Sequence, residues 1–187
     1  MSRVEERIRE EHMKSQVINL NTCKSQHIAN FFIDKSEEDK IGITQLKLIK
    51  LVYIAYGWHL ATIDKKLFNE PIKTWKNGPV IESLYHEFKH FKQDIINSKS
   101  IIFDLDTGDY CIPHVQDKEI LDTLDTVWMG YRNFTAESIV YREHKEDTAW
   151  YKYYKKDENI IIPDKDIKDD FQRRISSYLE VQKAKYG

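Results

Sequence analysis

Residues 44–60, TQLKLIKLVYIAYGWHL, decide the fold of this chain. Apolar side chains recur there at the three- and four-residue spacing of an α-helix, and they fill two adjoining faces. One face carries Leu46, Ile49, Tyr53, Tyr56 and Leu60, and the other carries Leu48, Leu51, Val52 and Ala55. Thr44 suits the N-cap, because its hydroxyl can accept a hydrogen bond from a backbone N–H of the first turn. We therefore predict a central helix that is largely buried.

Amphipathic segments on both sides of this stretch predict further helices. They begin near Asn21 and Thr22, at Asp117, at Asn133 and Thr135, and at Asp164. Between the first of them and the central helix, residues 34–40, DKSEEDK, have the composition of a polar loop. These patterns predict a mainly α fold: a single compact helical domain over residues 21–187, preceded by a charged extension over residues 1–20.

Two segments break the helical pattern. Pro71 and the Asn77-Gly78-Pro79 cluster interrupt residues 67–80, LFNEPIKTWKNGPV, and predict an ordered loop. Pro79 suits the first turn of the next helix, since its missing N–H would have no intrahelical partner there. Short β-prone runs at residues 101–103 and 110–112 flank a turn, which predicts a small β-hairpin.

The composition limits the classes of function. The 187 residues carry 29 Lys and Arg against 31 Asp and Glu, so no overall field attracts nucleic acid or an anionic membrane. The two cysteines form no C-x-x-C pair, and neither a disulfide framework nor a cysteine zinc site is expected. Because no signal-peptide pattern and no run of ~20 apolar residues occurs, we expect a cytoplasmic protein without a membrane partner.

His86, Glu87 and His90 spell H-E-x-x-H, the motif in which two histidines one helical turn apart bind zinc and the glutamate activates water. The apolar face of this predicted helix centres near Leu84 and Phe91, so both histidines are expected to face solvent. A lysine inside the motif further disfavours a dication. A zinc-dependent hydrolase stays an alternative, because a third ligand could come from elsewhere in the chain.

No other catalytic signature occurs. The chain has no G-x-S-x-G elbow, no phosphate-binding glycine loop and no Cys-His nucleophile spacing. We therefore expect a protein that is not an enzyme and needs no cofactor or metal.

Residues 150–156, WYKYYKK, interleave aromatic rings with lysines, as in platforms that stack single-stranded nucleic acid. The rings can equally pack inward while the lysines lie at the rim, and no basic stripe continues elsewhere. A nucleic-acid-binding module is thus a second alternative, although nucleic acid is not the partner that we expect.

An ordered pattern runs through residues 44–91: a Leu-x-Lys-Leu-x-Tyr helix ending in Gly-Trp, a Leu-Phe turn, a Trp before Gly-Pro-Val, and a Leu-Tyr pair. Its positions are Leu48, Lys50, Leu51, Tyr53, Gly57, Trp58, Leu67, Phe68, Trp75, Gly78, Pro79, Val80, Leu84 and Tyr85. This pattern resembles the Panacea (SocA-like) antitoxin family of prokaryotes and phages, and a weaker echo reaches Trp150. Ile49, Thr74 and Asn77 depart from the residues common in that family.

The resemblance implies an antitoxin that neutralises a cognate toxin by direct contact, in one branch by delivering it to an ATP-dependent protease. We expect the partner-binding residues to be Lys50, Tyr53, Trp58, Trp75, Asn77, Gly78, Pro79 and Tyr85. A tryptophan beside a rigid Gly-Pro junction is typical of binding hot spots, although Trp75 could instead pack as core. Lys50, among apolar neighbours, is expected to snorkel to solvent or pair with an acid.

Overall fold

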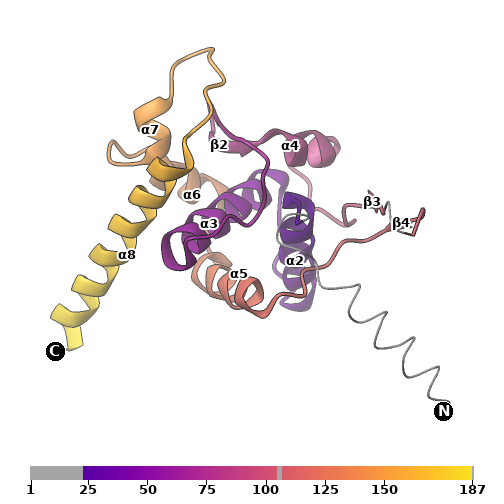
Figure 1. Ribbon diagram of the computed structural model, residues 1–187, viewed down its shortest axis with the longest axis horizontal. Coiled ribbons are helices and arrows are strands. Elements are labelled where there is room, and N and C mark those ends of the chain that lie inside the picture. Colours follow the sequence, from indigo (N-terminus) through magenta and orange to yellow (C-terminus); the bar gives the residue numbers. More distant parts are fainter. Residues whose placement is uncertain (1–22, 105–106, 187) are drawn as a thin grey trace.

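The fold is built around α3 (Gln45–Ile63), the helix predicted from residues 44–60 (Figure 1). The computed structural model describes residues 23–104 and 107–186. Thr44 caps α3 as predicted, because its hydroxyl accepts the N–H of Lys47 at 3.4 Å. Residues 48–56 are all buried, and other helices contact α3 on several sides. The prediction of a buried central helix is confirmed.

Helices pack around α3 on two sides, and α5 (Lys118–Tyr131), α6 (Ala136–Glu143) and α7 (Ala149–Tyr153) begin at side-chain caps. On one side, α2 (Ser25–Glu38) and α5 pack against each other and against α3. On another side, α6 and α8 (Asp164–Tyr186) pack against α3. The short helix α7 packs on α8. Asp117 and Thr135 cap α5 and α6 as predicted. The mainly α fold is confirmed.

The boundaries of α2 differ from those predicted. The expected start at Asn21 and Thr22 lies outside the described residues, and the described helix begins at Ser25. Residues 34–38 belong to α2, so the prediction of a polar loop over 34–40 is wrong for most of its length. The helix continues there because Ile33 and Ser36 are still buried against the core.

Residues 72–81 form a β-hairpin where the sequence predicted a loop. β1 (Ile72–Trp75) pairs antiparallel with β2 (Gly78–Ile81), and Thr74 lies opposite Pro79. Residues 160–162 add to the other edge of β1: Ile160 accepts the N–H of Thr74, and Ile72 accepts the N–H of Ile162, both at 2.8 Å. The hairpin therefore depends on a contact from far along the chain, which periodicity cannot reveal.

The helix start predicted at Pro79 is wrong for the same reason. Pro79 belongs to β2, and α4 (Glu82–Phe88) begins only after that strand, followed by a 3-10 turn (Lys89–Phe91). The hairpin predicted from residues 101–103 and 110–112 is confirmed, because β3 (Ile102–Phe103) pairs with β4 (Tyr110–Cys111).

The C-terminal half of α8 extends beyond the body of the molecule (Figure 1). Ile167 and Phe171, in its first turns, are fully buried, whereas every described side chain from Ser176 onward is exposed.

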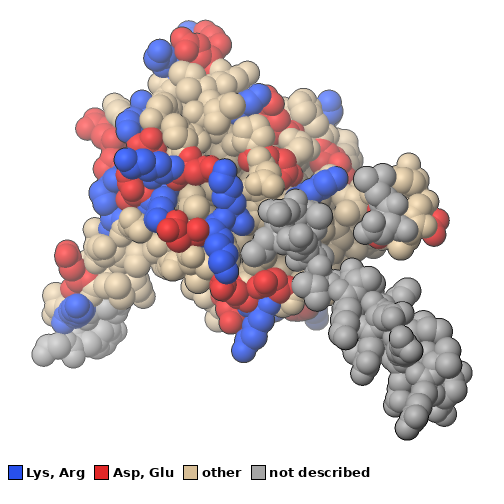
Figure 2. All heavy atoms as spheres, in the orientation of Figure 1, with Lys and Arg blue, Asp and Glu red and all other residues tan. Residues whose placement is uncertain are grey.

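Charges of both signs are interspersed over the face shown in Figure 2. Within residues 23–104 and 107–186, no helix is both long and apolar enough to span a bilayer. Cys23 and Cys111 are free thiols.

Candidate functional site

Lys50 connects the central helix to the β1–β2 hairpin. Its side chain is 1% exposed, and Nζ donates a hydrogen bond to the carbonyl oxygen of Pro79 at 2.6 Å. Gly78 has a φ of +98°, and a Cβ on this residue would lie 2.7 Å from Nζ of Lys50. Both the left-handed backbone and the close approach favour glycine. The expectation that Lys50 snorkels or pairs with an acid is wrong, since a backbone carbonyl is its hydrogen-bond partner.

Burial of Lys50 makes the stability of the protein depend on pH. Burial lowers the pKa of Lys50 from 10.5 to about 7, and the nearby Glu143 carboxylate only partly opposes the shift. The unfolded chain keeps the ordinary pKa, so between these two values it binds one more proton than the folded chain. The free energy of unfolding should therefore rise with pH from pH 7 towards pH 10.5 and stay level below pH 7.

We expect urea unfolding to reveal this dependence as a difference between wild type and Lys50→Met. The wild type should gain about 2 kcal/mol relative to the variant between pH 7 and pH 9, because the variant has no amine to titrate. Other titrating groups are common to both proteins and cancel in the difference. A difference that stays constant with pH would contradict the low pKa.

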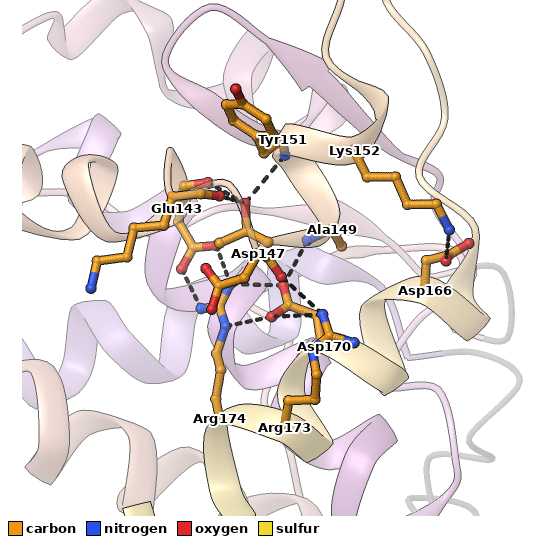
Figure 3. Close-up of polar contacts among 11 residues, drawn as sticks. Glu143, Asp147, Ala149, Tyr151, Lys152, Asp166, Asp170, Arg173 and Arg174 are labelled. Atoms are coloured by element: carbon orange, nitrogen blue, oxygen red, sulfur yellow. Dashed lines mark hydrogen bonds and ion pairs between the residues drawn. The ribbon is translucent and has the colours of Figure 1, made fainter. Parts of the chain in front are cut away.

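A buried ion-pair cluster joins α6 to α8 (Figure 3). Arg174 donates to the two Glu143 carboxylate oxygens at 2.7 and 3.0 Å, and it makes two further bonds of 2.8 Å to Asp170. The side chains of Glu143 and Asp170 are only 1% and 2% exposed. Burial opposes the charge of Arg174, but these two carboxylates outweigh it and raise the pKa of the guanidinium. Asp170 also accepts the N–H of Ala149 at 2.8 Å, which positions the start of α7.

α3 and α8 cross where Gly57 of α3 lies against the ring of Phe171 of α8. A Cβ on Gly57 would lie 2.2 Å from the ring of Phe171, so α8 can approach this closely only where α3 has glycine. The ring of Tyr53 packs edge-on against Phe171 with 5.6 Å between centroids. The Tyr53 side chain is fully buried, and its hydroxyl has no hydrogen-bond partner among the described residues.

Aromatic rings fix the hairpin to the helical body. Trp75 packs edge-on against Tyr85 with ring centroids 4.7 Å apart, and its carbonyl accepts the indole N–H of Trp150 at 2.9 Å. Trp150 is itself stacked between His144 and Tyr154, with centroid distances of 4.0 and 4.4 Å. Lys50 and Trp150 therefore each donate a hydrogen bond to a backbone carbonyl oxygen of the hairpin, and these two bonds fix its orientation relative to the helices.

The turn of the hairpin is accessible to a partner. Lys76 and Asn77 are exposed, and Trp75 and Tyr85 are half-buried beside them. A cleft of about 590 Å³ lies between the hairpin and residues 154–159, with Trp75, Lys76 and Tyr154 in its wall. This arrangement presents a rigid aromatic and polar surface of the kind that proteins recognise.

The structure separates the eight predicted binding residues into two groups. Lys50, Tyr53, Gly78 and Pro79 are buried, and Lys50 is bonded to the hairpin through the carbonyl oxygen of Pro79. The other four are at least partly exposed: Trp75 and Tyr85 pack together, Asn77 is exposed in the turn of the hairpin, and Trp58 is half-buried on α3. Contact between these residues and a partner stays a prediction.

The H-E-x-x-H residues do not share one regular helix. His86 lies in α4, whereas His90 lies in the 3-10 turn that follows. Both side chains are exposed, as predicted, and the carboxylate of Glu87 accepts a hydrogen bond from Ser100 at 2.9 Å. No group of three or more potential ligands converges within the described part of the chain.

The aromatic residues of segment 150–156 are divided between core and surface. Trp150 is 4% exposed and both faces of its ring are covered, so it cannot stack a base. Tyr151 is 48% exposed, and Tyr153 donates its hydroxyl to Asp166 at 2.7 Å. The continuous stacking platform that the composition suggested is therefore not formed.

The sequence pattern missed the ion-pair cluster. Asp170 and Arg174 stand four residues apart on a helix, a spacing that indicates a pair on one face. Their third member, Glu143, comes from a different helix, and only the fold brings it to Arg174. The i, i+4 spacing in the sequence could therefore have identified the pair of Asp170 and Arg174, whereas no pattern in the sequence near Glu143 indicates that it binds Arg174.

Comparison with known proteins places this arrangement in a family. Residues 48–151 match the family model described as Antitoxin SocA-like, Panacea domain. The chain belongs to this family. The matched segment contains Lys50, the β1–β2 hairpin and Trp150, and it ends before α8.

A curated relative is the Antitoxin SocA of Caulobacter vibrioides (strain NA1000 / CB15N). It is 28% identical over 124 residues, which cover 66% of this chain and 66% of that antitoxin. No solved structure is significantly similar to the chain.

Proposed function

We propose that this Panacea-domain protein is an antitoxin that neutralises a partner toxin in the cytoplasm by direct protein–protein contact. Membership of the SocA-like family supports an antitoxin role, and the similarity to an antitoxin of Caulobacter vibrioides points the same way. The observation that carries the proposal is the rigid hairpin, which presents Trp75, Asn77 and Tyr85 on an accessible surface while Lys50 and Trp150 hold it from behind.

The two groups of predicted residues have different roles in this proposal. Trp75 and Tyr85 provide a pre-formed aromatic surface, and a partner that binds it loses little side-chain freedom there, which favours affinity. Asn77 adds an exposed amide that can donate and accept hydrogen bonds. Lys50 and Gly78 act indirectly, by fixing the shape of the turn. Trp58 belongs to the same proposal as a second, half-buried contact.

Direct contact can neutralise a toxin by covering its active site or by delivering it to an ATP-dependent protease. The two routes predict different toxin lifetimes in the cell. Covering leaves the toxin stable in complex, whereas delivery shortens its half-life when the antitoxin is present. Pulse-chase measurement of the toxin with and without this protein decides between them.

We expect Asn77→Arg to abolish growth rescue while leaving the fold intact. The test co-expresses this chain with the product of each gene that flanks its own and measures growth. Asn77 is exposed, so the substitution costs little stability, but a bulky charge at the centre of the binding surface should weaken the complex by roughly 100-fold. Asn133→Arg is the matched control, because Asn133 is also exposed and lies in the turn that follows α5, outside the hairpin.

Two results would each reject a part of this proposal. Wild-type protein that rescues no toxin and forms no complex with one removes the antitoxin function. Rescue that is equal for Asn77→Arg and Asn133→Arg removes the hairpin as the contact surface but keeps the function.

A further inference from the structure

His144 lies against the tryptophan that anchors the β1–β2 hairpin. Its imidazole ring is nearly parallel to the indole ring of Trp150, with 9° between the ring planes and 4.0 Å between the centroids. The ring of Tyr154 covers the opposite face of the indole at 4.4 Å. The indole N–H of Trp150 donates to the carbonyl oxygen of Trp75, so the packing of His144 on Trp150 bears directly on how the hairpin is held.

One nitrogen of the His144 ring has no place for a proton. Nε2 is buried and has no hydrogen-bond partner among the described residues. The neutral ring avoids an unpaired donor there by carrying its single proton on Nδ1, whereas the charged ring has an N–H on both nitrogens. The stack on Trp150 and the position at the end of α6 favour a cation, but neither supplies an acceptor at Nε2. The geometry therefore favours a neutral His144 in the folded protein.

The charged groups near His144 favour the neutral ring as well. Lys50 on α3 repels the imidazolium, and Glu143 on α6 attracts it less strongly. The Glu143 carboxylate is already bonded by both Nη atoms of Arg174 on α8, which also bonds Asp170 of the same helix. Burial and then Lys50 lower the pKa of His144 from 6.5, and Glu143 opposes them only in part.

The lowered pKa fixes the direction of the pH effect. Below pH 6.5 a His144 ring that is free in water takes up a proton, whereas the ring packed on Trp150 stays neutral. A falling pH therefore favours any state in which the ring has left the stack. Lys50 strengthens this effect, because its amine becomes charged as the pH falls through about 7 and then repels an imidazolium.

We propose that His144 makes the hairpin sensitive to pH: in mildly acidic conditions its ring becomes charged and leaves Trp150, and the hydrogen bond from Trp150 to Trp75 loosens. Lys50 keeps its bond to the carbonyl oxygen of Pro79, so the hairpin stays attached through β2 while its hold on β1 weakens. Trp75 belongs to the surface proposed to bind the toxin, so affinity for the toxin should fall with pH. This last consequence rests on the proposed antitoxin function.

NMR on the purified full-length protein tests the effect on the hairpin without a partner. In the wild type, protection of the Trp150 indole N–H against hydrogen exchange should fall roughly fivefold between pH 7 and pH 5.5, because a free ring titrates near 6.5. His144→Phe keeps a stacking ring but gains no proton, so its protection should stay constant. His90→Phe is the matched control and should behave as the wild type, since His90 also lies against a ring, 4.1 Å from Phe91, but is exposed.

Titration of the His144 ring in the wild type is a second measurement, which needs no variant. A pKa below 6.5 supports the proposal, and a pKa at or above 6.5 overturns it. Burial also lowers the pKa of His27 and of His59, but both residues are common to the wild type and His144→Phe, so their effects cancel in the comparison.

Calorimetry with the toxin identified by growth rescue tests the consequence for binding. The wild type should bind roughly fivefold more weakly at pH 5.5 than at pH 7, and His144→Phe should not show this loss. If protection of the Trp150 indole changes equally in the wild type and His144→Phe, the inference fails and the antitoxin function stands. If the wild type neutralises no toxin, the proposed function fails, and the NMR measurements still decide whether His144 controls the hairpin. A hairpin that loosens without a loss of affinity rejects the link from His144 to the toxin.

Discussion

Replacing Arg174 with methionine is expected to lower the free energy of unfolding by roughly 3–5 kcal/mol. Arg174 holds Glu143 and Asp170 through four hydrogen bonds of 2.7–3.0 Å, and both carboxylates are almost fully buried. Removing the guanidinium leaves two like charges without their cation in a region of low polarity, and their lost solvation is then uncompensated. Chemical denaturation at pH 7 measures the effect.

The control for this prediction is the neighbouring residue. Arg173 is 58% exposed, its nearest contact to Asp170 is 3.8 Å, and its 2.9 Å hydrogen bond to the Asp147 carbonyl oxygen is exposed. Arg173→Met should therefore lower the stability by no more than about 1 kcal/mol. A loss of similar size in both variants would show that the helix needs positive charge in general. A loss confined to Arg174→Met identifies the buried cluster as its cause.

Replacing Gly57 with valine is the second large expected effect, a destabilisation of roughly 3 kcal/mol or more. Even a Cβ at this position would stand 2.2 Å from Phe171, and two adjacent ring atoms are closer than 2.7 Å. The ring is fully buried and has no space to withdraw, so α8 must move away from α3. Thermal unfolding and denaturant titration measure the loss.

Gly130 provides the matched control, because it also lies in a helix, α5, but nothing stands within 4 Å of a Cβ there. Gly130→Ala should therefore stabilise the protein by about 0.5–1 kcal/mol, as expected for removing helical glycine without a clash. Opposite signs at the two glycines would confirm that the close approach of α8, and not helix propensity, requires glycine at position 57.

Much of the fold could be predicted from local patterns. The two apolar faces of residues 44–60 predicted the buried helix α3, since a helix with so little polar surface has to lie at the centre. Thr44, Asp117 and Thr135 were recognisable as caps, because capping joins a side chain to a backbone N–H within the same turn. The exposure of His86 was also predicted from helical phase, and His90 is exposed as well, although it lies in the 3-10 turn after α4.

Local patterns failed where distant segments decide the structure. Pro79 suits a helix start, but residues 160–162 pair with β1 and the segment becomes a strand. Lys50 was expected to reach solvent or an acid, yet the hairpin brings a carbonyl oxygen 2.6 Å from its amine. Glu143 carries no local sign that it binds Arg174.

The sequence by itself determined the helical class, the central helix and the membership of the Panacea family that its ordered pattern indicated. The tertiary structure alone decided which of those residues can meet a partner. Lys50, Tyr53, Gly78 and Pro79 are buried, whereas Trp75 and Tyr85 are half-buried and Asn77 is exposed. Periodicity describes the neighbours of a residue within a few turns. Burial at the hairpin depends instead on α6, on Trp150 of α7 and on residues 160–162, all of which come from far along the chain.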